Sequence, residues 1–80
     1  MKIETIKEKI EYLKNKREEE RAFIKQCDED YKNCTDKEER HNIFDTINRW
    51  TDACNQTTKR IEHYEILIYC KQREKELDVR

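Results

Sequence analysis

The chain has 80 residues with 18 basic and 19 acidic side chains, which gives a net charge of -1, and 46% of its residues are charged. Eighty residues allow one domain at most, and near-equal numbers of the two charges argue against a nucleic-acid site that depends on a basic excess. Glycine and proline are absent, which removes the usual residues of tight turns. We therefore expect a single all-α domain over residues 1–80.

The sequence carries no signal for a membrane or for secretion. It has no run of about 18 apolar residues, and its first residues, MKIETIKEK, lack the apolar core of a signal peptide. We therefore predict a cytoplasmic protein with no membrane partner.

The cysteines do not form a Cys-x-x-Cys pair. In a cytoplasmic chain, cysteines at such spacings are most often small buried apolar side chains. We expect this structural role, and we predict no metal site and no cofactor. The residues concerned are Cys27, Cys34, Cys54 and Cys70.

The first expected helix covers about residues 2–34. Its apolar residues recur at alternating spacings of three and four, which is the heptad pattern of a coiled-coil seam. Two positions of that seam are polar, Arg17 and Glu20. The other seam positions are Ile3, Ile6, Ile10, Leu13, Ile24, Cys27, Tyr31 and Cys34.

The residues that follow this segment carry the sequence signal of a second helix. Thr35-Asp36-Lys37-Glu38 matches a capping box, so we predict a turn at 34–36 and a second helix over about 36–77, with an Asp36/Arg40 pair in its first turn. Such a short connection forces the helices to run antiparallel. The predicted fold is an antiparallel two-helix coiled-coil hairpin. Its second seam comprises Ile43, Ile47, Trp50, Cys54, Thr57, Ile61, Tyr64 and Ile68.

A polar layer interrupts this seam. If the chain folds back about Thr35, Glu20 lies opposite Trp50, and Arg17 lies opposite Cys54. Arg17 can then pair with Glu20 and stack on the indole ring. One interpretation is that this layer fixes the register and the number of helices at some cost in stability. The other is that it opens a site for a ligand or a partner.

The segment HYEILIYC, residues 63–70, is apolar around most of the helix, although a helix in a hairpin has only one neighbour. Exposed apolar surface of this kind indicates association. We predict a homodimer that forms a four-helix bundle, with a foreign protein as the alternative occupant. The predicted partner or dimer interface comprises Phe23, Phe44, Tyr64, Ile66, Leu67 and Tyr69.

Residues for catalysis are sparse. The chain has no serine, and without glycine it cannot form a glycine-rich phosphate loop. His41 and His63 fall on outward positions. Glu38 and His41 have the Glu-x-x-His spacing of dimetal bundles, but the first helix offers no carboxylate at that level. We predict that the protein is not an enzyme.

These observations predict a protein-binding module. The specific form that we favour is a small stoichiometric inhibitor from a phage or mobile element that acts on a host defence complex. One alternative is RNA binding by a basic stripe, an architecture similar to that of dimeric helical-hairpin regulators of plasmid copy number. Another is a structural or ligand-binding bundle with a pocket near Arg17, Trp50 and Tyr12. The basic stripe comprises Lys7, Lys9, Lys14, Lys16 and Arg21.

Overall fold

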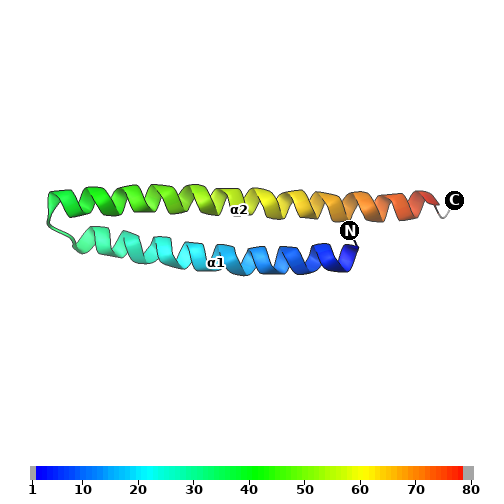
Figure 1. Cartoon of the computed structure of the whole chain (residues 1–80), viewed down its shortest axis with the longest axis horizontal. Helices are drawn as coiled ribbons and strands as arrows, with labels where there is room; N and C mark the ends of the chain where they lie inside the picture. Colours follow the sequence, from blue (N-terminus) through cyan, green and yellow to red (C-terminus); the bar gives the residue numbers. More distant parts are fainter. Residues whose placement is uncertain (1, 79–80) are drawn as a thin grey trace.

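The computed structural model describes residues 2–78, and the side chains of residues 2–75. It contains two long helices, α1 over Ile3–Asn33 and α2 over Lys37–Asp78, and no strand within those described residues. The helices lie side by side, run antiparallel and are joined by a short connection at one end (Figure 1). The all-helical prediction is confirmed. Between residues 2 and 78, neither helix has an apolar stretch that could cross a membrane.

The connection is extended, and an aspartate starts the second helix. Cys34 has φ -86° and ψ 130°, outside the helical region. A carboxylate oxygen of Asp36 accepts a hydrogen bond from the backbone N–H of Glu38 at 3.1 Å, and the Asp36 carbonyl accepts one from the N–H of Arg40 at 2.9 Å. Asp36 is therefore the N-cap residue, and the predicted capping box of Thr35 is wrong. An aspartate caps a helix as well as a threonine does, and its negative charge suits the helix N-terminus.

The core occupies the open end of the hairpin, away from the connection. Ile6, Leu13 and Ile61 are almost fully buried there, and Ile10 completes the cluster. These residues occupy predicted seam positions, so the heptad pattern identified the buried stripe. Leu67, which was predicted to belong to the partner or dimer interface, is half-buried against this cluster together with Tyr64 and Ile68.

The pairing between the helices differs from the predicted one. Glu20 contacts Thr57 rather than Trp50, and Arg17 contacts Thr58 rather than Cys54. Residues of α1 thus meet α2 residues that lie one to two helical turns further along the chain than the predicted partners. The connection has the predicted length, since residues 34–36 are not helical. Its backbone is extended, however, and the first turn of α2 lies beyond the last turn of α1 along the rod (Figure 1).

The hairpin is a thin rod with a large exposed surface. Its Cα atoms span 67 × 15 × 15 Å, with a radius of gyration of 18.6 Å, against about 12 Å for a compact chain of this length. The accessible surface is 6694 Å², against about 5,200 Å² expected for a compact protein of 10.0 kDa. Part of the difference arises because α2 runs past the first residue of α1 (Figure 1).

Substitutions at two adjacent residues of α1 should differ strongly in their effect on stability. Leu13 is 3% exposed in the core, whereas Tyr12 is 67% exposed. We expect Leu13→Ala to lower the free energy of unfolding by about 2–5 kcal/mol, because it removes apolar contacts and leaves a cavity. Tyr12→Ala should change it by no more than about 0.5 kcal/mol. Urea unfolding followed by circular dichroism measures both, and equal effects would contradict the described packing.

Candidate functional site

The polar layer in the middle of the seam contains a buried carboxyl group. Glu20 is 5% exposed and Thr57 is 4% exposed. The Thr57 hydroxyl lies 2.8 Å from a carboxylate oxygen of Glu20 and 3.0 Å from the Ala53 carbonyl. A hydroxyl has a single hydrogen, so these two acceptors compete for it. The layer is thus a tightly placed polar contact between the two helices, within an otherwise largely apolar stripe.

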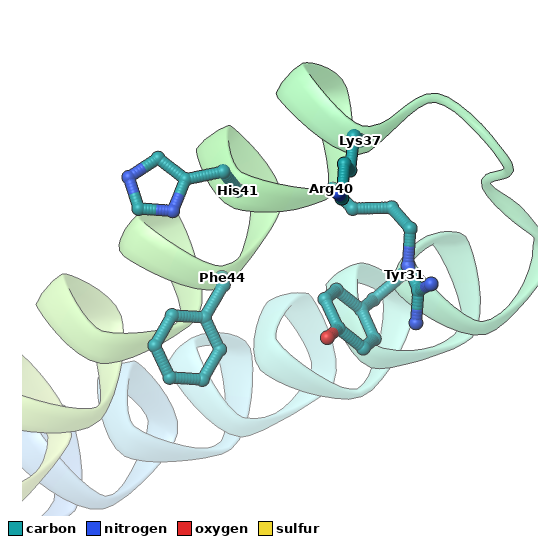
Figure 2. Close-up of a pocket in the computed structure, with 5 residues that line it drawn as sticks. All are labelled: Tyr31, Lys37, Arg40, His41 and Phe44. Carbon is teal, nitrogen blue, oxygen red and sulfur yellow. The ribbon is translucent and has the colours of Figure 1, made fainter.

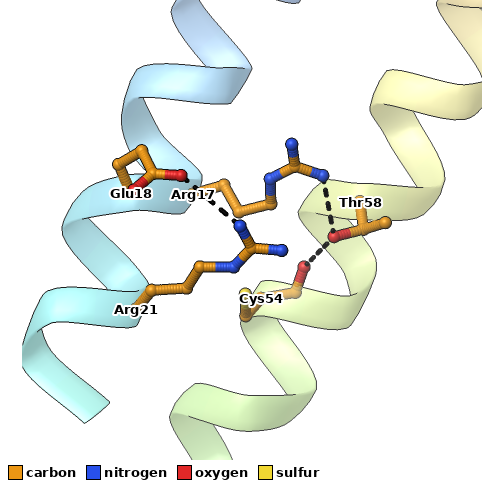
Figure 3. Close-up of polar contacts among 5 residues, drawn as sticks. All are labelled: Arg17, Glu18, Arg21, Cys54 and Thr58. Atoms are coloured by element: carbon orange, nitrogen blue, oxygen red, sulfur yellow. Dashed lines mark hydrogen bonds and ion pairs between the residues drawn. The ribbon is translucent and has the colours of Figure 1, made fainter. Parts of the chain in front are cut away.

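Arg17 reaches across the same layer in a short chain of hydrogen bonds. Its Nη1 donates to the hydroxyl of Thr58 at 3.5 Å, and that hydroxyl donates to the carbonyl of Cys54 at 3.0 Å (Figure 3). The Nε of Arg17 is buried and has no hydrogen-bond partner among the described residues. Arg21, one turn along α1, pairs with Glu18 at 3.4 Å on the surface. An unsatisfied buried donor costs stability, so the polar layer carries an energetic cost within the seam.

Trp50 lies outside this layer. Its ring is 4.4 Å from the ring of Phe23, centroid to centroid, with the two planes at 40°. Both side chains remain open to solvent, at 38% for Trp50 and 41% for Phe23. The predicted four-residue layer is therefore corrected: Arg17, Glu20 and Cys54 lie in the seam, and Trp50 forms an exposed aromatic pair on its edge. The shifted register explains the difference.

A second aromatic pair lies at the turn end of the rod. The rings of Tyr31 and Phe44 are 6.4 Å apart, and the guanidinium of Arg40 lies 4.5 Å above the Tyr31 ring. Arg40 was predicted to pair with Asp36, but its side chain stacks on this ring instead. Together with Lys37 and His41 these residues line an open cavity of about 290 Å³, which we call the turn-end pocket (Figure 2).

An apolar patch lies near the other end, on α2. Ile66 and Tyr69 are 60% and 62% exposed, and they are three residues apart, so they are neighbours on the helix surface. About half a turn separates Ile66 from the buried Ile61 and the half-buried Tyr64 around the helix, so Ile66 lies on the side away from α1. We call Ile66 and Tyr69 the outer patch. Of the predicted interface residues, Phe23, Phe44, Ile66 and Tyr69 are exposed, whereas Tyr64 and Leu67 are half-buried.

The cysteines are free thiols. Cys27 and Cys54 are buried, Cys34 is half-buried and Cys70 is exposed. No group of three or more histidine, cysteine or acidic side chains suited to a metal ion occurs in the described part of the chain.

The turn-end pocket was not predicted from the sequence. A signal for it was present, because Lys37, Arg40, His41 and Phe44 follow spacings of three, one and three residues and therefore share one face of α2. Tyr31, however, comes from α1. Its place in the pocket depends on the register between the helices, which a single helix pattern does not define.

No protein-family model, curated protein or solved structure matches the chain in the comparisons with known proteins.

The polar layer yields a prediction with a matched control. Thr57→Val should lower the free energy of unfolding by about 1–3 kcal/mol, because Glu20 loses its hydrogen-bond partner in the seam. Changing both partners to apolar residues, Glu20→Leu with Thr57→Val, should restore or exceed the original stability. Thr51→Val, at an exposed threonine of α2, should change it by no more than about 0.5 kcal/mol. Thermal and urea unfolding measure all three variants. A double variant with a lower free energy of unfolding than Thr57→Val would refute this account of the layer.

Proposed function

We propose that the chain is a non-catalytic protein-binding module that pairs with a second copy of itself into a four-helix assembly and binds another protein stoichiometrically. The observation that carries the proposal is the outer patch. Ile66 and Tyr69 are large apolar side chains, exposed by 60% and 62% on a helix side that α1 does not cover. Paired exposed side chains of this kind are typical of an association surface.

The exposed area supports a second copy as the occupant of the outer patch. The hairpin exposes 6694 Å², which is roughly 1,500 Å² more than a compact protein of its mass. A standard interface buries about 800 Å² of each partner. A second hairpin can therefore cover the patch and still leave the remaining surface typical of a small protein. Because Ile66 faces away from α1, the two copies meet through α2, with their α1 helices on the outside.

The small core supports association as well. Among the residues whose side chains are described, only six apolar side chains are buried. Chains of this size commonly need cross-links, metals or oligomerisation to supplement such a core. Burial of an isoleucine and a tyrosine from each copy adds apolar contacts to this single stripe. The six residues are Ile6, Ile10, Leu13, Cys27, Cys54 and Ile61.

The aromatic pair of Phe23 and Trp50 supports a separate contact with a foreign protein. The rings already stack on one another at 4.4 Å, so little side-chain freedom is lost when a partner covers them. Tryptophan is among the commonest residues at energetic centres of interfaces. Trp50 and Ile66 are about 24 Å apart along α2 at 1.5 Å per residue. A dimer through the outer patch therefore leaves this pair free.

The specific form that we propose is a cytoplasmic inhibitor from a phage or mobile element that occupies a host defence complex. Its support is the short, highly charged chain with exposed aromatic side chains. Such a protein acts by occupying a surface of its target, which requires anchoring side chains and a rigid scaffold rather than reactive groups.

The test of self-association is the solution mass of the native chain and of the variant Ile66→Glu with Tyr69→Glu. We expect a dimer for the native protein and a folded monomer for the variant, because four carboxylates would meet at a two-fold contact. Light scattering on a sizing column gives the mass, and circular dichroism gives the helix content. Leu67 is left unchanged, because it packs against the core.

The matched control adds the same charge elsewhere on α2. Asn48→Glu with Asn55→Glu changes two exposed residues outside the outer patch, and this variant should remain a dimer. A native monomer would overturn the proposed dimer, and a dimer that survives the Ile66 and Tyr69 changes would move the interface elsewhere.

A further inference from the structure

The turn-end pocket has an aromatic part and a cationic part. Tyr31 and Phe44 contribute rings 6.4 Å apart, and Phe44 is 50% exposed. Lys37 and Arg40 contribute positive charge beside these rings (Figure 2). The cavity of about 290 Å³ is at the small end of the range for ligand sites, roughly 300–1,000 Å³. It is large enough for one ring with one attached group rather than for an extended ligand.

The two cations are available to a ligand. Neither Lys37 nor Arg40 takes part in an ion pair among the described side chains. The guanidinium carbon of Arg40 lies 4.5 Å from the centroid of the Tyr31 ring, a cation–π contact that still leaves the guanidinium N–H groups able to donate hydrogen bonds. His41 differs, because its Nε2 lies 3.6 Å from a carboxylate oxygen of Asp45. The free positive charge of the pocket thus comes from one lysine and one arginine.

We infer that the turn-end pocket binds an aromatic ring that carries an anionic group, presented by a protein partner. Such a group uses both parts of the pocket: the ring packs on Phe44 and Tyr31, and the anion accepts hydrogen bonds from Arg40 and Lys37. A phosphate ester, which carries nearly two negative charges at neutral pH, matches the two cations. A bare anion leaves the rings exposed, and a neutral ring leaves the cations unpaired.

The surroundings of the pocket favour a protein partner over a nucleic acid. A second open groove at the same end of the rod is lined by Asp30, Asp36 and Glu39. These carboxylates repel the continuous phosphate backbone that dominates nucleic-acid binding. A single anionic side chain on an otherwise mixed protein surface avoids that repulsion, because it enters the pocket alone.

The pocket is independent of the proposed dimer contact. Phe44 and Ile66 are about 33 Å apart along α2 at 1.5 Å per residue. The inference depends on the proposed function only for the source of the anionic group, because the chemistry of the pocket can be tested with small molecules. A failure to bind them would leave the self-association result unchanged, so the two ideas can fail separately.

The experiment is a titration of the full-length protein with phenyl phosphate, inorganic phosphate and phenol, followed by backbone amide NMR. Phenyl phosphate should bind at least about tenfold more tightly than either of the others and should shift signals of residues near the pocket. Equal binding of inorganic phosphate, or shifts confined to another part of the chain, would overturn the inference.

Variants assign the binding to named side chains. Arg40→Gln and Lys37→Gln should each weaken phenyl phosphate about tenfold through loss of a charged donor. Phe44→Ala should remove the preference for phenyl phosphate over inorganic phosphate. Lys59→Gln, which removes the same charge from an exposed position of α2 outside the pocket, should bind like the native chain. Comparable weakening by Lys59→Gln would show a general charge effect and would overturn the site.

The source of the anion is tested with two larger probes, a short phosphotyrosine peptide and a short single-stranded oligothymidylate. The peptide should bind more tightly than the oligonucleotide, with the same dependence on Arg40 and Phe44. Tighter binding of the oligonucleotide through these residues would overturn the choice of a protein partner.

Discussion

The structure depends on one constraint: a hairpin of two helices has only a single contact surface. Each helix can bury one stripe of side chains, because there is no third element to cover another. The seam residues of α1 and α2 therefore supply most of the packing, and large side chains off the seam stay at least partly in contact with water among the side chains described. Tyr12, Phe44, Ile66 and Tyr69, each at least half exposed, follow directly from this geometry. Exposed apolar residues are thus an expected feature of the architecture.

The polar layer divides the seam and offers a physical reason for the observed pairing of the helices. A heptad pattern alone allows α2 to slide along α1 by seven residues and still place apolar residues against apolar residues. Glu20 removes that freedom, because its buried carboxyl group needs a hydrogen-bond donor small enough to fit inside the seam. Thr57 is the one such residue among the predicted seam positions of α2, and it contacts Glu20 at 2.8 Å. A costly polar contact can in this way select one register from several.

The same reasoning explains which features the sequence could predict. The three-and-four spacing identified Ile6, Leu13, Glu20 and Ile61 as seam residues, because burial in a two-helix contact follows the helix period. The pattern did not define the offset between the helices, which depends on how far the extended connection carries the start of α2 along the rod axis. Glu20 was therefore placed against Trp50. The turn-end pocket was missed because its residues come from both helices: Tyr31 lies on α1 and Arg40 on α2.

The two ends of the rod differ in chemistry, and this difference bears on how the proposed dimer would act. The outer patch is apolar and lies near the open end, whereas the turn-end pocket combines rings with positive charge. Association through the outer patch would leave both turn-end pockets of the dimer exposed. Two linked sites on a rigid scaffold raise the overall affinity for a partner that presents two anionic groups, provided that the spacing matches. Long helices curve gently, and the described part of the chain contains no proline or glycine to kink them, so that spacing would vary little. Dimerisation would then contribute to selectivity as well as to stability.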